Sequence, residues 1–269
     1  MKLTIQIVNF QSRHYLERCL FSISENLPVG IEAEVLILNN DKEPLEELAG
    51  ELKNKINLRI HEIGENIGFG RAHNAGFRRS FGEYILFLNP DTSVSPDALQ
   101  VLLNVLEKNQ EVGIAGPLLV DSLGKIQSDC FGTRRTPFST IRKKIFERGG
   151  QPTGADGEIF ETDWISGGAM LVRRDVFEKT GGFDENFFMY FEDVDLCLRA
   201  KKQGVKIAVN PKARIFHESG KSFSSEREKK KYYYASQDHF MQKHFGRTAA
   251  GFVKLLRLPY YVKNVWLSR

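Results

Sequence analysis

At 269 residues, the chain is long enough to bury a full hydrophobic core, either as one large α/β domain or as one domain with a helical appendage. Its 41% hydrophobic and 27% charged residues are ordinary for a soluble globular protein, and no stretch approaches the roughly 18 consecutive apolar residues of a membrane-spanning helix. The net charge of +4 divides unevenly: residues from Lys221 onward carry +8 and residues 1–220 carry −4, which predicts an anionic partner for the tail.

Strands and helices alternate through the first half. Apolar or alternating runs predict strands over residues 3–9, 34–39, 56–63 and 84–88. Amphipathic or capped segments predict helices around residues 15–23, 44–52, 69–80 and 97–109, the last with Ser95 as its cap. This order and spacing predict βαβ units, and hence an α/β fold with a mostly parallel central sheet flanked by helices.

The second half is less regular. Expected strands cover residues 112–120, 164–172 (broken at Gly167-Gly168), 205–209 and 213–217. Expected helices cover residues 174–180 and 192–203, followed in the tail by 226–245 and 249–266. Residues 133–148 form a basic segment, and residues 151–157 form a Gly/Pro loop.

An amide and a carboxylate follow the predicted strand 84–88, in the run Leu88-Asn89-Pro90-Asp91. An open α/β sheet binds its ligands just outside the carboxyl ends of its strands, which is where Asp91 should lie. Hard divalent cations take oxygen ligands and bridge protein carboxylates to substrate phosphates. Because Asn-Pro-Asp is also ordinary turn chemistry, these residues alone leave both interpretations open.

Three carboxylates in four positions, Glu192, Asp193 and Asp195, follow the aromatic run 187–191. Like charges this close repel, so such a cluster usually receives a cation, a proton or a polar ligand. A carboxylate with an apolar flank and a charged neighbour is a candidate general base. An acidic first turn also stabilises a helix through its dipole, which is the simpler alternative.

Two further features are weak when taken singly. His217 ends a short predicted strand, where a histidine is most often an ordinary core or surface residue. The loop 64–70 precedes a predicted helix, as a phosphate-binding loop would. It is not a dinucleotide fingerprint, because His73 stands where the third glycine would be.

In combination, these stretches resemble inverting glycosyltransferases of family 2, which have the nucleotide-sugar-binding GT-A fold, and most of all their rhamnosyltransferase-type members. The matching stretches, in the family's order and spacing, are Ile5–Phe10, Glu65–Gly76, Leu88–Asp91, Gly167–Arg174, Gly181–Glu185, Phe191–Arg199 and His217-x-x-Gly220-x-Ser222. The resemblance implies a GT-A catalytic domain over residues 1–222 and a basic amphipathic helical tail over residues 223–269. The Gln/Arg-x-x-Arg-Trp motif of processive synthases is absent from the sequence, which favours transfer of a single sugar.

The resemblance also implies roles for individual residues. Asp193 matches the aspartate that serves as catalytic base. Asp91 matches the second aspartate of the Asp-x-Asp metal motif, and His217 matches a late histidine that completes the shell of a Mg²⁺ or Mn²⁺ ion. The residues expected to bind the donor or its nucleotide are Asn9, Asn39, Asn40, Asn66, Gly68, Arg71, Asn74, Asn89 and Asp91. Those expected to contact the acceptor or the transferred sugar are Trp164, Gly167, Gly168, Glu192 and Asp195.

The implied reaction is a one-step displacement in cell-surface polysaccharide synthesis. Asp193 takes the proton from an acceptor hydroxyl, which attacks the anomeric carbon while the nucleoside diphosphate leaves from the opposite face. The implied donor is dTDP-rhamnose or a UDP-sugar, and the implied acceptor is a glycan or a polyprenyl-diphosphate-linked saccharide. A UDP-hexose-dependent transferase and a non-catalytic nucleotide-sugar-binding protein remain as alternatives.

The tail interleaves basic and aromatic residues in 229–234 and 252–266, which is typical of a helix lying in an anionic membrane interface. The apolar side of the same tail helix would equally suit packing on the body of the protein or a homodimer contact. Nucleic acid is not expected, because the body is acidic and the sequence holds no recognised module. The sequence shows no signal peptide, and its three cysteines lack the spacing of disulfides or metal ligands. We therefore expect a cytoplasmic protein that can lie peripherally on the inner face of the cell membrane.

Overall fold

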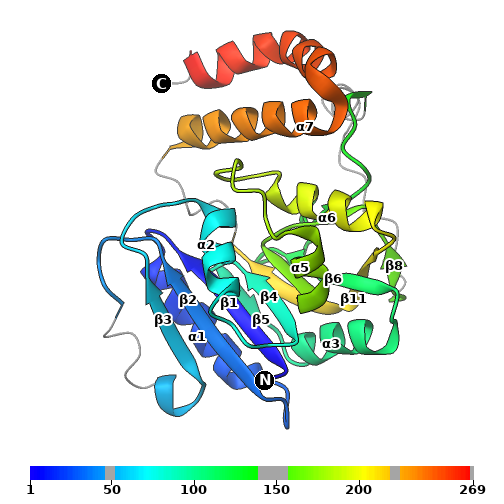
Figure 1. The fold of residues 1–269 in the computed structure, drawn as a ribbon. Helices are drawn as coiled ribbons and strands as arrows, with labels where there is room; N and C mark the ends of the chain where they lie inside the picture. The colour runs from blue at the N-terminus through cyan, green and yellow to red at the C-terminus, as the bar shows by residue number, and fades with distance from the viewer. Residues whose placement is uncertain (46–51, 139–156, 219–224, 267–269) are drawn as a thin grey trace.

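The structure is a computed structural model that describes residues 1–45, 52–138, 157–218 and 225–266. A central sheet carries helices on its faces, and a helical pair lies across one end of the molecule (Figure 1). The strands are β1 Leu3–Asn9, β2 Ala33–Asn39, β3 Leu58–Glu62, β4 Tyr84–Leu88, β5 Thr92–Val94, β6 Val112–Val120, β7 Phe131–Gly132, β8 Phe160–Glu161, β9 Trp164–Ile165, β10 Ala169–Arg173 and β11 Lys206–His217. The α-helices are α1 Arg13–Asn26, α2 Phe69–Phe77, α3 Ala98–Lys108, α5 Arg174–Thr180, α6 Glu192–Lys202 and α7 Glu226–Tyr261, with short turns η2 Leu52–Asn54 and η3 Val262–Trp266.

The strand order is β3-β2-β1-β4-β10-β6-β11-β5, and β8 also pairs with β11. The α/β class is confirmed, but the sheet is mixed: parallel pairing joins β3, β2, β1 and β4 and also joins β6 to β11, whereas β10 is antiparallel to both of its neighbours. Ala169 at the start of β10 pairs with Leu88 at the end of β4. This reversal brings the loop before β10 to the carboxyl edge of the parallel strands, where ligands bind in open α/β sheets.

Alternating side chains divide the core between the two sheet faces. Leu86 and Leu88 of β4 pack into one cluster with α1 and α3, whereas Ile85 and Phe87 pack into a second cluster with α5 and α6. Cys19, Cys130 and Cys197 are buried free thiols within these clusters, as their spacing predicted.

Several element boundaries differ from the sequence-based expectation. The two strands expected over 205–209 and 213–217 form the single strand β11, with a register shift between Val209 and Arg214 against β6. Helix α3 is capped by the left-handed backbone of Asp97, and Ser95 contributes only its carbonyl to the Ala98 amide. Most of the helix expected over 44–52, the end of the basic segment 133–148 and nearly all of the loop 151–157 lie outside the described residues.

The tail is a helical hairpin. Gly246 (φ 86°, ψ 169°) interrupts α7, so the two helices expected in the tail are present as two segments that fold back on each other (Figure 1). The first segment belongs to the protein core, because Phe240 and Met241 are fully buried in the second hydrophobic cluster. Among the helices in the described residues, none has the length and apolarity needed to span a membrane.

Candidate active site

Asp193 lies in the first turn of α6, directly after two residues with left-handed backbone. Tyr190 and Phe191 have φ values of 70° and 69°, a conformation that costs about 1–3 kcal/mol for a non-glycine residue and that clusters at functional sites. The Asp193 carboxylate accepts hydrogen bonds from two backbone amides, those of Gly167 (2.9 Å) and Val194 (2.7 Å). The side chain is therefore held at the loop before β10 in one orientation.

Burial dominates the electrostatics of this turn. It raises the pKa of Asp193, although the backbone hydrogen bonds from Gly167 and Val194 and the charge of Arg135 act in the opposite direction. Burial and the neighbouring negative charge of Asp193 raise the pKa of Glu192 well above its usual value. Glu192 is 5% exposed, and its Oε2 has no hydrogen-bond partner among the described residues. A carboxylate with a raised pKa is a better proton acceptor near neutral pH.

A second polar cluster lies at the carboxyl end of β4. His217 Nε2 lies 3.3 Å from Asp91 Oδ1 and 3.3 Å from Asn89 Nδ2. Gln127 donates through Nε2 to the His217 carbonyl (2.7 Å), which turns its Oε1 toward His217 Nδ1 (2.8 Å). With the Nδ1–H tautomer that this contact favours, Nε2 accepts from Asn89 Nδ2 and lies beside Asp91 Oδ1.

This pair fits a divalent cation. Asp91 is 5% exposed, and its Oδ1 makes no hydrogen bond within the described residues although it lies 3.3 Å from His217 Nε2. Two acceptor atoms that face each other favour a cation between them, and an oxygen and an imidazole nitrogen suit Mg²⁺ or Mn²⁺. Within the described chain, no third His, Cys, Asp or Glu completes a group of metal-binding side chains with them. The donor diphosphate and water would have to supply the remaining ligands.

A continuous set of contacts joins the two clusters. The Asp193 carboxylate accepts a hydrogen bond from the backbone amide of Gly167. The carbonyl of the next residue, Gly168, accepts one from the backbone amide of Asn89 at 3.0 Å. Asn89 in turn contacts His217, which lies beside Asp91. A side chain at Gly167 would meet the Phe69 ring at 3.0 Å, so glycine is needed for this close approach. Residues 91 and 193, far apart in the sequence, therefore lie at the same edge of the sheet.

A cavity of about 660 Å³ lies at the carboxyl ends of β1 and β2. Asn40 and Asn66 line it, and the Asn40 amide contacts Asn66 and the Gly68 carbonyl, both at 3.4 Å. Asn40 Oδ1 is buried without a hydrogen-bond partner in the described residues and is available to a ligand. A nucleotide would occupy this position in an open α/β sheet.

Seven of the nine expected donor-binding residues do not line this cavity: Asn89 and Asp91 belong to the second polar cluster, and Gly68 accepts a hydrogen bond from Asn40 through its carbonyl. The other four lie elsewhere. The Asn9 and Asn39 side chains are fully buried beneath it and bond to each other at 2.8 Å. Arg71 and Asn74 of α2 instead hold the loop 183–185, Arg71 through the Glu185 carbonyl and Asn74 through the Phe183 backbone. Asn9, Asn39 and Asn74 are thus held within the fold, whereas Arg71 is bonded through Nε and its side chain is 53% exposed.

Of the residues expected to contact the acceptor, some lie beside Asp193 and others do not. Gly167 and Glu192 lie beside Asp193, and Trp164 is nearly buried, with its Nε1 donating to the Thr133 carbonyl (2.9 Å). Asp195 differs from the expectation: it is fully buried and bonded to Arg199 of α6 and to Lys243 and His244 of α7, each at 2.7 Å. Asp195 therefore fastens the tail to α6 and has no surface left for a sugar.

Two residues of the site were missed from the sequence. Gln127 orients His217, but it stands 90 positions away and has no motif around it. Asp41 lines the cavity at β1 and β2 and accepts hydrogen bonds from the Gln11 backbone amide (2.6 Å) and from Asn9 (3.2 Å). It follows Asn39 by two residues, and only the fold shows that its carboxylate reaches the cavity.

Comparison with known proteins identifies the class to which this fold and site belong. The family model described as "Glycosyltransferase like family 2" matches residues 2–234, so the chain belongs to this family.

Among curated relatives, the N-acetylglucosaminyl-diphospho-decaprenol L-rhamnosyltransferase of Mycobacterium tuberculosis is 28% identical over 248 residues, which is 82% of this chain and 77% of the relative. The rhamnosyltransferase WbbL of Escherichia coli K12 is 28% identical over 224 residues, 79% of this chain and 82% of WbbL.

Solved structures confirm the GT-A fold. The mannosyltransferase PcManGT from Pyrobaculum calidifontis, in complex with GDP-Man and Mn²⁺, superposes with a TM-score of 0.64 at 14% identity and covers 98% of this chain and 72% of its own. TarS of Staphylococcus aureus superposes with a TM-score of 0.61 at 15% identity, with the same coverage of the two chains. At these identities the likeness concerns the fold alone.

Proposed function

We propose that the protein is an inverting glycosyltransferase that moves one sugar from a nucleotide-sugar donor to an acceptor hydroxyl. The observation that carries this proposal is the joining of Asp193, a half-buried carboxylate with a raised pKa, to the Asp91–His217 pair through Gly167, Gly168 and Asn89. A base and a site for the departing diphosphate at one sheet edge are what a single displacement requires.

In this reaction, the Asp193 carboxylate accepts the proton of the acceptor hydroxyl. The backbone amides of Gly167 and Val194 hold that carboxylate in place before the proton is transferred. Asp91 and His217 would hold a divalent cation, whose positive charge stabilises the diphosphate as it leaves. Asn40 and Asn66 would bind the nucleotide in the cavity at β1 and β2.

We further propose dTDP-rhamnose as the donor and a polyprenyl-diphosphate-linked saccharide as the acceptor, in cell-surface polysaccharide synthesis. This choice is supported by the relatives named as rhamnosyltransferases, one of which is named for a diphospho-decaprenol acceptor. A relative named as a hexosyltransferase, 25% identical over 209 residues, keeps a UDP-hexose donor as the competing candidate.

The experiment is a panel of nucleotide sugars, incubated with the protein, an acceptor and Mg²⁺ or Mn²⁺, with release of nucleoside diphosphate as the readout. We expect release from dTDP-rhamnose that stops when EDTA is added. Release from UDP-hexoses in preference to dTDP-rhamnose would replace the donor assignment. Donor binding without release from any sugar would support the alternative of a non-catalytic nucleotide-sugar-binding protein.

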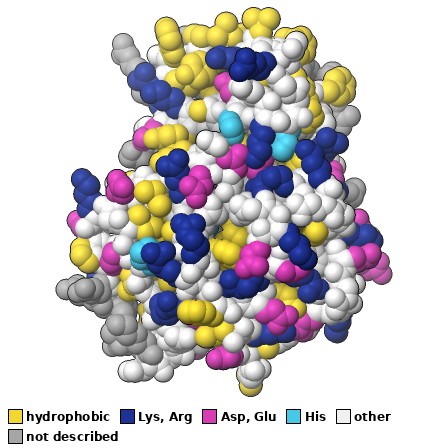
Figure 2. Space-filling view, in the orientation of Figure 1, with side chains coloured by type: hydrophobic (Ala, Val, Ile, Leu, Met, Phe, Trp, Pro, Cys, Tyr) yellow, Lys and Arg dark blue, Asp and Glu magenta, His cyan; other side chains and the backbone are white. Residues whose placement is uncertain are grey.

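We also propose that residues 1–222 form the catalytic domain and that the tail, residues 223–269, is its membrane-contacting part, at the cytoplasmic face. The segment after Gly246 turns Val253 and Arg257 inward, and Arg257 bonds to Asp238 of the first segment (2.5 Å). Its other side exposes apolar side chains, among them Phe252, Leu255 and Trp266 at 55%, 67% and 72% exposed. Figure 2 shows hydrophobic side chains gathered over this end of the molecule. Such a surface suits an anionic membrane interface; a homodimer contact is the competing use.

A further inference from the structure

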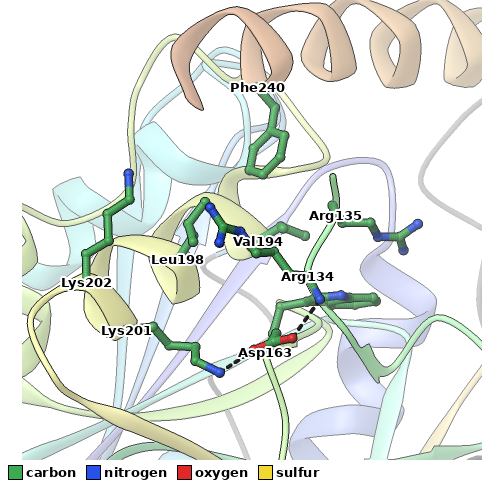
Figure 3. Close-up of a pocket in the computed structure, with 9 residues that line it drawn as sticks. Arg134, Arg135, Asp163, Val194, Leu198, Lys201, Lys202 and Phe240 are labelled. Atoms are coloured by element: carbon green, nitrogen blue, oxygen red, sulfur yellow. Dashed lines mark hydrogen bonds and ion pairs between the residues drawn. The ribbon is translucent and has the colours of Figure 1, made fainter. Parts of the chain in front are cut away.

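A second, smaller cavity of about 230 Å³ lies between α6, α7 and the β7–β9 ribbon (Figure 3). Four cationic side chains line it: Arg134, Arg135, Lys201 and Lys202. The only carboxylate among its lining residues is Asp163, so the lining carries a net charge of +3. None of its lining residues lines the nucleotide cavity at β1 and β2.

Asp163, the carboxylate that lines the cavity, already has partners within the protein. Asp163 pairs with Lys201 and accepts a hydrogen bond from the backbone amide of Arg134 at 2.7 Å (Figure 3). Arg135 contacts Asp129 outside the cavity at 3.4 Å, and Arg134 lies over the Phe245 ring, 5.8 Å from its centre, with a further contact inside the fold. Within the described residues, Lys202 has no ion-pair partner. Cations gathered around a concave, partly apolar surface repel one another, and an anion bound among them relieves that repulsion.

The cavity begins next to the catalytic carboxylate. Val194, the residue after Asp193, lines it, and the charge of Arg135 acts on the Asp193 carboxyl. Arg135 lies over the ring of Trp164, 4.7 Å from its centre. Lys201 lies eight residues further along α6, which is ~12 Å along the helix axis. The cavity therefore runs beside α6 from the residue after Asp193 to Lys201 and Lys202.

Opposite the cations, the wall is apolar. Leu198 of α6 and Phe240 of α7 line this side, Leu198 half-buried and Phe240 fully buried where it descends from the tail (Figure 3). The same helical hairpin carries the exposed apolar side chains of its second segment at the end of the molecule. Cationic and apolar walls together match an anionic group that is linked to a hydrocarbon chain.

We propose that this cavity binds the diphosphate of a lipid-linked acceptor, with Arg134 and Lys202 as its principal cationic contacts. The inference rests on the proposed function and adds a second anion site to it: the donor diphosphate at Asp91 and His217, and the acceptor diphosphate along α6. Because the apolar wall would contact a hydrocarbon chain, the cavity should bind a prenyl diphosphate more tightly than a free phosphate.

Calorimetry with the full chain tests the site directly, with farnesyl diphosphate and inorganic pyrophosphate as probes and EDTA present so that no metal bridges them to Asp91. We expect farnesyl diphosphate to bind more tightly than pyrophosphate. The double variant Arg134→Ala/Lys202→Ala should weaken its binding roughly tenfold or more, since a hydrogen bond to a charged group contributes about that much. The matched control Lys125→Ala, which removes an exposed lysine that lines neither cavity, should leave it unchanged. Equal binding of both probes, or unchanged binding in the double variant, would overturn the proposal.

A kinetic comparison separates this inference from the proposed function. The acceptors are N-acetylglucosamine carried on farnesyl diphosphate and its uncharged octyl glycoside. We expect the double variant to raise KM roughly tenfold for the diphosphate acceptor only, with kcat and the donor KM unchanged. Equal KM changes for both acceptors would overturn the diphosphate site while leaving the transferase intact. Absence of transfer to either acceptor by the wild-type protein would instead count against the proposed function.

Discussion

At Asp193, burial and hydrogen bonding act in opposite directions. Two backbone amides stabilise the ionised carboxylate, yet burial outweighs them and raises the pKa. Glu192 beside it shows the same effect more strongly, because one of its oxygens has no partner among the described residues. The turn therefore holds two carboxyl groups that bind protons more tightly than fully exposed carboxyl groups do. Of the two, Asp193 is partly exposed, and its two hydrogen bonds fix the orientation of its side chain.

The raised pKa of Asp193 predicts the pH dependence of the reaction. In the proposed reaction Asp193 accepts a proton only when ionised, so kcat/KM should rise with pH through a pKa above the usual value of 3.8. A pH profile of kcat/KM at saturating metal measures this. A profile that is flat from about pH 4 upward would show that the base has an ordinary pKa.

Glu192 predicts an effect on stability. Because its folded pKa lies above the unfolded value of 4.5, the protonated form is favoured by folding, and this contribution is lost as pH rises through the folded pKa. Glu192→Gln removes the buried charge, so it should increase the free energy of unfolding near neutral pH by on the order of 1 kcal/mol. The gain should disappear below pH 4.5, where the wild-type carboxyl is already protonated. Urea denaturation at the two pH values measures it; an equal gain at both would contradict the electrostatic cause.

At the scale of elements, the sequence predicted the parallel half of the sheet and the break at Gly167-Gly168, because hydrophobic periodicity and glycine pairs are local signals. It did not show that β10 runs antiparallel beside β4, which depends on a long-range pairing. The partners of Asn74 and Asp195 are equally non-local: Asn74 bonds to a loop 109 positions later, and Asp195 to a tail helix 49 positions later. Motif matching placed these two polar residues in the site, but their hydrogen bonds place them behind it.

The tail hairpin depends on the backbone at Gly246. Its φ of 86° and ψ of 169° lie in a region that is almost restricted to glycine, so Gly246→Ala should lower the free energy of unfolding by about 1–3 kcal/mol. Neither Gly246 nor Gly251 has an atom within 4 Å of an added Cβ, so packing does not distinguish the two positions. Gly251 lies within the helix, and Gly251→Ala should stabilise by about 0.5–1 kcal/mol. Chemical denaturation of both variants is the measurement, and a loss of stability of the same size in Gly251→Ala would contradict this explanation.

At the scale of the whole molecule, the charge asymmetry and the exposed apolar residues occur at the same end. The triple variant Phe252→Ser/Leu255→Ser/Trp266→Ser keeps the inward-facing Val253 and Arg257, so it should fold and lose most binding to anionic liposomes. Co-sedimentation with phosphatidylglycerol-containing vesicles measures this. Phe81→Ser/Leu123→Ser, which removes exposed apolar side chains of the body, is the control and should bind as wild type does. Binding by the triple variant equal to that of the control would show that the tail is not the membrane contact.

The most direct test of the account compares Asp193→Asn with Asp91→Asn in donor-binding calorimetry and in turnover. If the two carboxylates serve one displacement, Asp193→Asn will lower kcat by ~10²-fold or more while donor binding stays near wild type. Asp91→Asn will instead weaken binding of the donor in the presence of Mg²⁺ or Mn²⁺. Retention of a tenth or more of wild-type turnover by Asp193→Asn would contradict the assignment of this carboxylate as the base.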